Sequence, residues 1–343
     1  MRFIRNAWYV AALSDEVSGE EPLARQVIGD FLVLYRDEDN RVVVLSDMCP
    51  HRFAPLSKGK VCAGKLQCPY HGLQFDGSGH CVANPHGDGH IPARAQVTNY
   101  PVEERYGAVW VWMGDAARAD ASLIPVSEHM DPTVSYVGYG QMVVQGNYQL
   151  ENDNILDLSH IEFVHPFFSS PAVSKGEVSH EVDGDAVWSR RDIHNDETPP
   201  EFIRHVFDVP EGPVDRWLHV YWQAPSYMNL TAGGGVAGTP REQCRVSHQV
   251  HWFTPETEIT TRYYFAVAVP RALGSQGQEM ADQQVQSLYQ PFEQEDKPLI
   301  EAQQARIGER DLSELKPIIL SVDGAGAAAR RVILRKLEQE NAT

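Results

Sequence analysis

Two short runs rich in cysteine and histidine constrain this chain more than any other feature. Cys49-Pro50-His51 and Cys68-Pro69-Tyr70-His71 form the pattern C-x-H, sixteen intervening residues, then C-x-x-H. Two thiolates and two imidazoles offered from two loops make a four-ligand metal site. A proline next to a ligand fixes φ in each loop, and Gly72 lets the backbone turn tightly behind His71.

The pairing of each cysteine with a histidine separates two kinds of metal site. Structural zinc sites usually pair Cys with Cys and His with His, at spacings C-x₂₋₄-C and H-x₃₋₅-H. A Rieske [2Fe–2S] centre instead needs two cysteines on one iron and two histidines on the other. Because each loop here supplies one sulfur and one nitrogen, we predict a [2Fe–2S] cluster, with zinc as the alternative. The predicted ligands are Cys49, His51, Cys68 and His71.

Composition restricts the class of protein. With 343 residues the chain can form two domains with separate cores. Its net charge of −18, from 47 acidic and 29 basic side chains, argues against nucleic acid and anionic membranes as partners. The longest apolar runs, such as 108–113, are too short to cross a bilayer. An odd number of cysteines beyond the cluster (Cys62, Cys81 and Cys244), without a secretory leader, predicts a cytoplasmic protein.

The strand signals in the first third of the chain predict an all-β domain. Residues 1–115 alternate short apolar segments with polar turns, as in the strand, turn and strand pattern of 31–45, and show no helical periodicity. Residues 116–132 are polar and contain two prolines, so we predict a linker there.

The remainder, 133–343, mixes strand and helix patterns, which predicts an α+β domain with an antiparallel sheet. We expect Pro291 and Pro298 to interrupt or kink the long helix late in the chain. The predicted elements are a strand at 134–144, a helix at 148–164, strands up to about 270, and helices at 278–307 and 327–340.

A second set of possible metal ligands lies in the predicted helix 148–164. Asn154, Asp157 and His160 are three residues apart and therefore share a helix face. His165 follows His160 by five residues, about 140° further round an ideal helix. Both histidines can reach one metal only if the helix ends or distorts between them.

Two imidazoles and one carboxylate form the facial triad of non-haem Fe(II) oxygenases, which leaves positions open for O₂. The alternative is a polar helix face with two incidental histidines. An electron-donating cluster in the same chain disfavours it, since the donor needs an acceptor. The sequence leaves the carboxylate open among Glu293, Glu295 and Asp296.

A glycine-rich segment at 233–238 matches the dinucleotide-binding pattern G-x-G-x-x-G. No predicted helix follows it, so we predict a hairpin turn rather than a nucleotide site. Nicotinamide is therefore expected to bind a separate reductase.

The motifs together resemble the Rieske non-haem iron oxygenases, in particular the oxygenase components of the vanillate and dicamba O-demethylase group. The resemblance extends over nearly the whole chain. Its motifs are IRNAWYVA at 4–11, CPHR-x-APLS at 49–57, CPYHGL at 68–73, N-x-x-D-x-x-H-x₄-H at 154–165, TPETE at 254–258 and EDK at 295–297.

The resemblance assigns roles that the residues alone leave open. It implies that Asp296 is the third iron ligand and that Asp157, with Asn154 beside it, is catalytic. Asp157 would bridge the cluster of one subunit to the iron of its neighbour, in a homotrimer closed as a head-to-tail ring. Asn229 and His251 would contact a carboxylate or ether oxygen of the substrate, with a structural role as the alternative. The implied fold is a Rieske domain followed by a helix-grip, START-like catalytic domain.

The implied activity is that of a monooxygenase. It would take electrons from NAD(P)H through a flavin- or ferredoxin-type reductase and use O₂ at Fe(II) to O-demethylate a small methoxylated aromatic acid, with release of formaldehyde. N-dealkylation or hydroxylation of another aromatic is the enzymatic alternative, and a Rieske electron carrier or sensor is the non-enzymatic one. Residues 198–240 depart from the vanillate and dicamba pattern, which leaves the substrate open.

Overall fold

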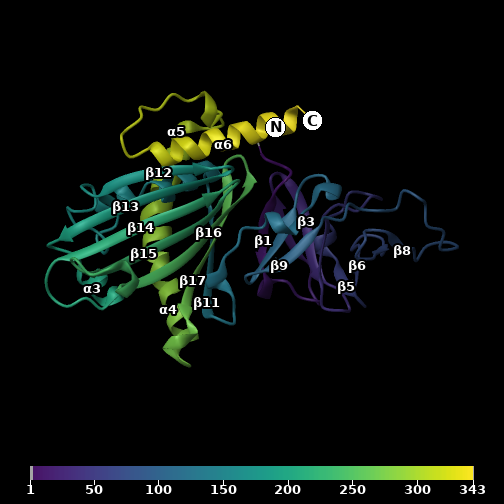
Figure 1. Cartoon of the computed structure of the whole chain (residues 1–343). Helices are drawn as coiled ribbons and strands as arrows, with labels where there is room; N and C mark the ends of the chain where they lie inside the picture. Colours follow the sequence, from purple (N-terminus) through teal and green to yellow (C-terminus); the bar gives the residue numbers. More distant parts are fainter. Residues whose placement is uncertain (1–2, 343) are drawn as a thin grey trace. The chain divides into compact units, whose positions relative to one another are not determined.

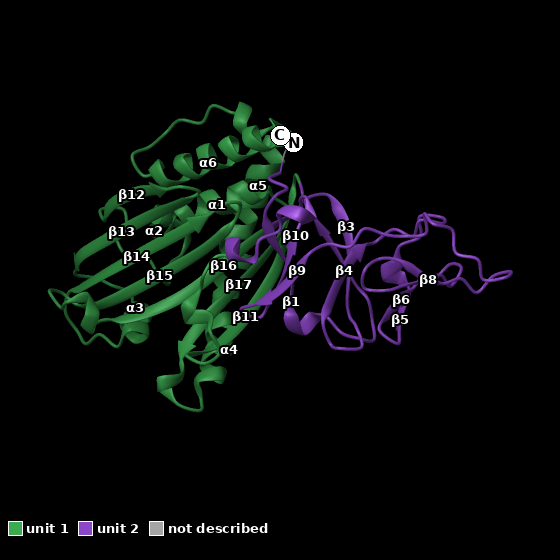
Figure 2. Ribbon diagram, turned by 45° about the vertical axis from the view of Figure 1, so that its right-hand side comes forward, with its two compact units in different colours: residues 1–2, 125–253, 258–343 green, residues 3–124, 254–257 purple. Residues whose placement is uncertain are grey.

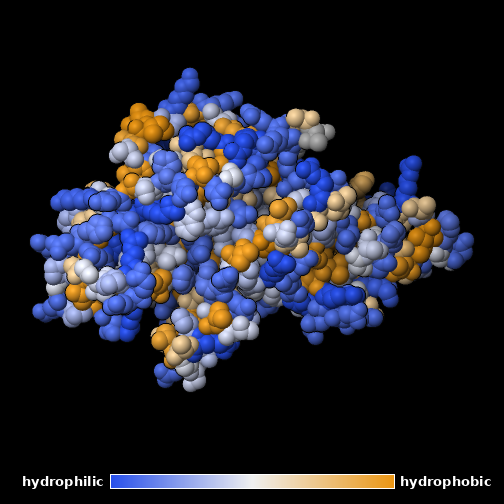
Figure 3. Space-filling view, viewed as in Figure 1, coloured by the Kyte–Doolittle hydropathy of each residue, from blue (hydrophilic) through white to orange (hydrophobic). Residues whose placement is uncertain are grey.

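The structure, a computed structural model, describes residues 3–342 and divides into two compact units (Figures 1 and 2). The N-terminal unit comprises Phe3–Ile124 with Thr254–Thr257, and the C-terminal unit comprises Pro125–Phe253 with 258–342. None of the described helices is long and apolar enough to span a membrane. On the face in Figure 3, hydrophilic residues predominate and hydrophobic ones form small separate groups.

The boundary between the units lies within the predicted linker 116–132. The linker contains short 3₁₀ turns in place of an extended chain. Asp115 and Asp120 each begin one of them, because their side chains accept the backbone N–H two residues further on. The three turns are Ala116–Arg118, Ala121–Leu123 and Glu128–Met130.

Three small antiparallel sheets form the N-terminal unit, with the strand orders β1-β10-β9, β2-β3-β4 and β5-β6-β7-β8. Within residues 3–124 the helical segments are 3₁₀ turns only, including Ser14–Glu16 and Leu56–Lys58, so the all-β prediction is confirmed. The strands are β1 Trp8–Leu13, β2 Leu23–Val27, β3 Asp30–Arg36, β4 Val42–Ser46, β5 Lys60–Cys62, β6 Lys65–Gln67, β7 Gln74–Phe75, β8 Cys81–Ala83, β9 Val102–Arg105 and β10 Ala108–Trp112.

A seven-stranded sheet with the order β11-β17-β16-β15-β14-β13-β12 forms the centre of the C-terminal unit. The pairings from β12 to β16 and between β11 and β17 are antiparallel, which confirms the predicted α+β class. The strands are β11 Ser135–Val144, β12 Glu177–Asp183, β13 Ala186–Asp196, β14 Val214–Gln223, β15 Tyr227–Val236, β16 Arg245–Thr257 and β17 Thr260–Pro270.

The helix predicted at 148–164 is interrupted earlier than expected. The helix α1, Tyr148–Leu156, begins at Asn147, whose side chain accepts the N–H of Gln149. It ends at Asp157, which has extended dihedral angles of φ −120° and ψ 96°. A 3₁₀ turn, Leu158–His160, and the short helix α2, Ile161–Val164, follow. The break therefore precedes both histidines and does not lie only between them.

A long helical segment late in the chain packs against the sheet (Figure 1). It consists of α4, Gly277–Tyr289, a π-helical stretch, Gln290–Asp296, and α5, Lys297–Ile307. The predicted interruption at Pro291 takes the form of this π-helical stretch, whereas Pro298 lies in the first turn of α5 and does not end that helix. Close packing needs Gly138 on β11, since an added Cβ would lie 2.6 Å from the carbonyl oxygen of Ala281.

Two further helices complete the unit. The last helix, α6, Gly324–Asn341, packs on β12 and β13. Sequence reasoning missed α3, Glu201–Phe207, whose first turn directly follows two prolines.

The glycine-rich segment 233–238 is not the predicted hairpin turn. Gly233, Gly234 and Gly235 lie within β15, and the turn begins after Val236. An added Cβ on Gly233 would lie 2.0 Å from the ring of Trp217 on the neighbouring strand β14. These glycines therefore make room for neighbouring side chains, and they lie within a strand instead of a loop that precedes a helix.

Candidate metal centres

The two cysteine–histidine loops have the same backbone geometry. In each loop the cysteine N–H donates to the carbonyl five residues on, Cys49 to Ala54 at 2.9 Å and Cys68 to Leu73 at 2.8 Å. The cysteine carbonyl accepts the N–H four residues on, at Phe53 and Gly72. Both of these residues have left-handed backbones, with φ values of 59° and 73°. Gly72 suits this conformation, whereas Phe53 adopts it at a conformational cost that the loop must offset.

The same loops bring the four predicted cluster ligands together. Cys49 and Cys68 are both 1% exposed and belong to the hydrophobic core of the N-terminal unit. Burial, followed by contact with Cys68, raises the pKa of the Cys49 thiol to about 11. The rings of His51 and His71 are 4.4 Å apart, and Nδ1 of His71 is buried without a hydrogen-bond partner. Two paired sulfurs, two paired imidazoles and a free ring nitrogen fit the donor set of a Rieske cluster.

A third loop, which sequence reasoning missed, supports His71. His86 donates from Nε2 to the carbonyl oxygen of His71 at 2.8 Å. The neighbouring Pro85 lies against Gly72, where an added Cβ would meet its ring at 3.2 Å. The sequence around His86 contains no motif that predicts this contact.

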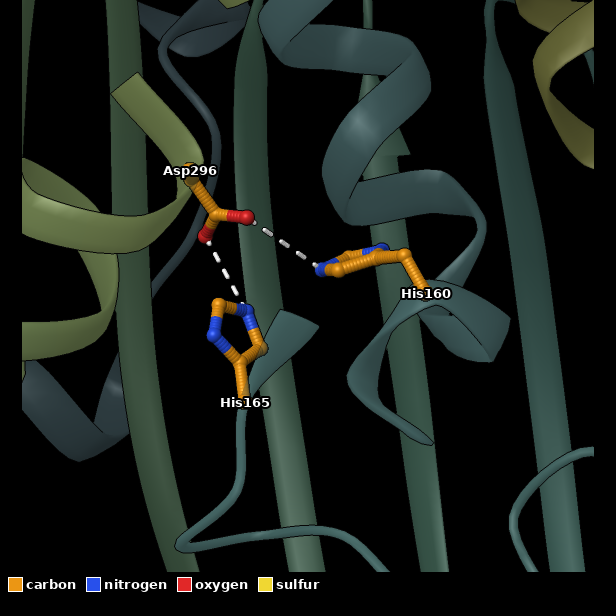
Figure 4. Close-up of side chains that lie close together, drawn as sticks. All are labelled: His160, His165 and Asp296. Carbon is orange, nitrogen blue, oxygen red and sulfur yellow. Dashed lines mark ion pairs between the residues drawn. The ribbon is translucent and has the colours of Figure 1, made fainter. Parts of the chain in front are cut away.

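The second candidate centre combines two histidines with one carboxylate (Figure 4). His160 ends the 3₁₀ turn after Asp157, His165 follows α2, and Asp296 ends the π-helical stretch. The ligand atoms lie within 4.8 Å of one another. The Asp296 carboxylate lies 3.6 Å from Nε2 of His160 and 3.2 Å from Nε2 of His165. The fold thus selects Asp296, and not Glu293 or Glu295, to face the two imidazoles.

Hydrogen bonds behind the imidazoles orient both rings toward that centre. His160 donates from Nδ1 to the main-chain oxygen of Asp157 at 2.7 Å. His165 donates from Nδ1 to Glu295 at 2.7 Å. Nε2 of each ring is thus left to face the Asp296 carboxylate. Partners of this kind fix the tautomer and orientation of metal-ligating histidines. Glu295 therefore orients the metal ligand His165. The sequence alone did not show whether Glu295 was itself a ligand.

The charges around His160 and His165 favour a cation at this centre. Burial lowers the pKa of His160, so its imidazole is neutral at pH 7. For His165 burial acts in the same direction, but the carboxylates of Asp296 and Glu295 outweigh it and raise the pKa. Asn154 donates from Nδ2 to Asp296 at 3.1 Å and so orients the carboxylate. Two imidazoles and one carboxylate, oriented from behind, fit the donor set of a mononuclear iron site.

Two buried arginines, also missed at the sequence level, hold residues before and after the two histidines. Arg191 on β13 donates to Asp157 at 3.3 Å and to the carbonyl of Val173 at 2.8 Å. Arg216 on β14 pairs with Asp196 at 2.9 Å, and both side chains are almost completely buried. Arginine is usually found at the surface, so the sequence contained no signal for these anchors.

The structure does not bring Asn229 and His251 together. Directly paired residues of an antiparallel sheet share a face, and successive residues alternate. Asn229 pairs with Val250, whereas His251 pairs with Met228, so the two side chains lie on opposite faces of the sheet. One ligand cannot contact both. The two side chains lie on opposite faces because the register of β15 against β16 offsets the two residues by one position. This register is set by how the strands pair.

Two family models together match most of the chain. A model described as Rieske [2Fe-2S] domain matches residues 7–101, and one described as vanillate O-demethylase oxygenase C-terminal domain matches residues 144–339. The chain is 40% identical over 341 residues to the oxygenase component of dicamba O-demethylase from Stenotrophomonas maltophilia, covering 99% of both chains. It is 35% identical to the oxygenase subunit of vanillate O-demethylase from a Pseudomonas species, over 98% of this chain and 96% of the relative.

A crystal structure of dicamba monooxygenase bound to 3,6-dichlorosalicylic acid superposes with a TM-score of 0.91 at 37% identity, covering 100% of both chains. The chain therefore belongs to the Rieske non-haem iron oxygenases, a family whose members use a [2Fe–2S] cluster and a mononuclear iron. Within that family it is an oxygenase component of the O-demethylase type. The resemblance recognised in the sequence is confirmed, and the comparisons do not favour the alternative activities.

Proposed function

We propose that this chain O-demethylates a small methoxylated aromatic acid. The observation that carries the proposal is the convergence of His160, His165 and Asp296, with Nδ1 of both histidines already engaged by Asp157 and Glu295. Dicamba and vanillate, the compounds named for the two relatives, are both aromatic acids with a methoxy group. The N-terminal 1–115 serves as the electron-transfer domain, 116–132 as a linker and 133–343 as the catalytic domain.

When bound, the cluster supplies single electrons and the Fe(II) supplies O₂ activation, so that a methoxy carbon is hydroxylated and lost as formaldehyde. The side chains of the protein bind and orient these groups. The proposed cluster ligands are Cys49, His51, Cys68 and His71, and the proposed iron ligands are His160, His165 and Asp296. The role of His251 is to contact a polar group of the substrate.

Asp157 and Asn154 orient the iron ligands. Asp157 accepts the Nδ1 proton of His160 at its main-chain oxygen, while its carboxylate, a quarter exposed, accepts from Ser159 and Arg191. We propose that this carboxylate also receives His71 of a neighbouring subunit, as the family resemblance implies. A carboxylate between two ligand imidazoles orients both and links the two metals. This bridge implies a head-to-tail ring of subunits, which the family resemblance implies is a homotrimer.

The partner that supplies electrons is proposed to be a separate flavin- or ferredoxin-type reductase that oxidises NAD(P)H. The relatives are named as oxygenase components, which is the description of one part of a larger system. A supply of NAD(P)H, together with the odd cysteine count, supports a cytoplasmic location.

The test supplies the purified chain with NADH, a surrogate reductase and a panel of methoxybenzoates. We expect formaldehyde release matched by oxygen uptake for at least one methoxybenzoate. The Asp157→Asn variant should retain both metals yet lose nearly all turnover, and light scattering should give three subunits per particle. Oxygen uptake without formaldehyde from any aryl methyl ether would exclude O-demethylation, and wild-type turnover in Asp157→Asn would exclude the bridge.

A further inference from the structure

His251 is a fully buried imidazole with one engaged and one free nitrogen. It lies on β16 with 0% of its surface exposed. Its Nδ1 is 2.7 Å from the hydroxyl of Tyr263 on β17, and its Nε2 has no hydrogen-bond partner. Burial lowers the pKa of His251 to about 3, so the ring is neutral. A neutral imidazole has one donor and one acceptor nitrogen, and the position of its proton decides which groups it can bind.

The hydroxyl of Tyr263 determines where that proton lies. Tyr263 is 3% exposed, and within residues 3–342 the hydrogen-bond partner of its hydroxyl is Nδ1 of His251. Burial, followed by the charges of Glu151 and Asp296, raises the pKa of Tyr263 far above its usual value, so the O–H proton is retained. If this O–H donates to Nδ1, the imidazole proton lies on Nε2. In the reverse arrangement Nδ1–H would donate to the phenol oxygen, and two buried groups, the phenol proton and the Nε2 lone pair, would stay unpaired. The first arrangement leaves only the Nε2 proton unpaired and is therefore favoured.

Aromatic rings surround this pair. The ring of Phe292 lies 5.7 Å from that of His251 and 5.6 Å from that of Tyr263, and Phe253 lies 4.6 Å from Tyr263. Phe292 and Asp296 belong to the same π-helical stretch, four residues apart. The free Nε2 is therefore a polar atom with aromatic side chains beside it, next to the segment that supplies the proposed carboxylate ligand of the iron.

We propose that Tyr263 is a positioning residue that holds His251 as a neutral hydrogen-bond donor at Nε2, and so selects aromatic substrates whose ring substituent is a hydrogen-bond acceptor. A carboxylate or an ether oxygen accepts from Nε2–H, whereas an ammonium group meets a second donor and stays unpaired. Leaving a buried polar group unpaired discriminates strongly between ligands. This inference rests on the proposed function, because it concerns the substrate of the same site.

The test compares two probes of similar shape in the iron-loaded protein without oxygen. 2-Methylbenzoate carries an acceptor, and 2-methylbenzylamine, an ammonium ion at pH 7, carries only donors. Calorimetry gives the dissociation constant of each. Wild-type protein should prefer the benzoate at least a hundredfold. The Tyr263→Phe variant removes one oxygen and should reduce this preference at least tenfold, mainly by weakening binding of the benzoate.

Tyr264→Phe is the matched control, since it removes a hydroxyl from the next residue of β17, whose side chain lies on the opposite face. It should keep the preference within twofold of the wild-type value. An unchanged preference in Tyr263→Phe, or an equal loss in both variants, would overturn the role of Tyr263.

A nitrogen-15 spectrum of histidine-labelled protein tests the tautomer without any ligand. The His251 signals, assigned by their absence in His251→Gln, should show a protonated Nε2 and an unprotonated Nδ1. A protonated Nδ1 overturns the inference. If neither probe binds but Nε2 is protonated, the proposed substrate class fails and the positioning by Tyr263 stands.

Discussion

Replacement of Arg216 by methionine should destabilise the C-terminal unit and loosen the segment that follows His165. Arg216 is 5% exposed and forms an ion pair with Asp196, which is 1% exposed, at 2.9 Å. It also donates to the carbonyl of Phe168 at 3.0 Å and to the hydroxyl of Ser170 at 2.8 Å. Methionine keeps much of the side-chain volume and removes the charge, so Asp196 remains buried without its cation.

The cost follows from that uncompensated charge. Removing one partner of a buried ion pair costs about 3–5 kcal/mol. In a unit of roughly 200 residues, each kcal/mol lowers the melting temperature by about 2–4 °C, so a decrease on the order of 10 °C is expected. The double variant Arg216→Met with Asp196→Leu removes both charges and should recover most of this loss.

Thermal unfolding followed by circular dichroism measures the effect. The control is Arg245→Met, which breaks an ion pair with Asp208 at 2.6 Å whose side chains are 61% and 71% exposed. An exposed pair contributes about 0–1 kcal/mol, so this variant should melt within a few degrees of wild type. Iron content should fall in Arg216→Met and not in the control. A melting temperature of Arg216→Met equal to that of the control, or a double variant no more stable than the single one, would refute the reasoning.

The other predictions concern the two metal centres and a buried carboxyl group. His160→Ala should lose the mononuclear iron and keep the visible spectrum of the cluster, and an unchanged iron content would remove His160 from the ligand set. Cys68→Ser should lose acid-labile sulfide and colour, and a variant that keeps both would exclude Cys68 as a ligand. Burial, followed by the charges of Asp296 and Glu301, raises the pKa of Glu151 from 4.5 to about 8. The folded protein therefore binds a proton that the unfolded chain has released, so stability should fall as pH rises from about 4.5 to 8, by about 4 kcal/mol in total. In iron-depleted protein, thermal melting between pH 5 and 8 should show this fall in wild type and much less of it in Glu151→Gln. A wild-type melting temperature that rises over this range would contradict the assignment.

The cluster loops and the general fold class were predictable from the sequence. Each cluster loop is closed by its own hydrogen bonds, and its cysteine and histidine lie two or three residues apart in sequence. The positions of the four ligands therefore follow from local chain geometry. Alternation of apolar residues over short segments likewise distinguished the all-β N-terminal unit from the α+β unit that follows.

The mononuclear site was predictable only in part. The two histidines were recognisable because they lie close together in sequence, but the break in their helix lies at Asp157, earlier than expected. The choice among Glu293, Glu295 and Asp296 depends on the rotation of a π-helical stretch more than a hundred residues away. The rotation directs Asp296 to the imidazoles and Glu295 to the back of His165.

By itself, the sequence determined the kind of metal centres, since neighbouring residues in a short loop or turn stay close whatever the rest of the chain does. Tertiary structure alone decided which distant groups support them: the carboxylate of Glu295, the anchors Arg191 and Arg216, and the opposite faces of Asn229 and His251. The physical reason is that strand register and helix rotation are set by packing over the whole unit, and a shift of one residue reverses the face on which a side chain lies.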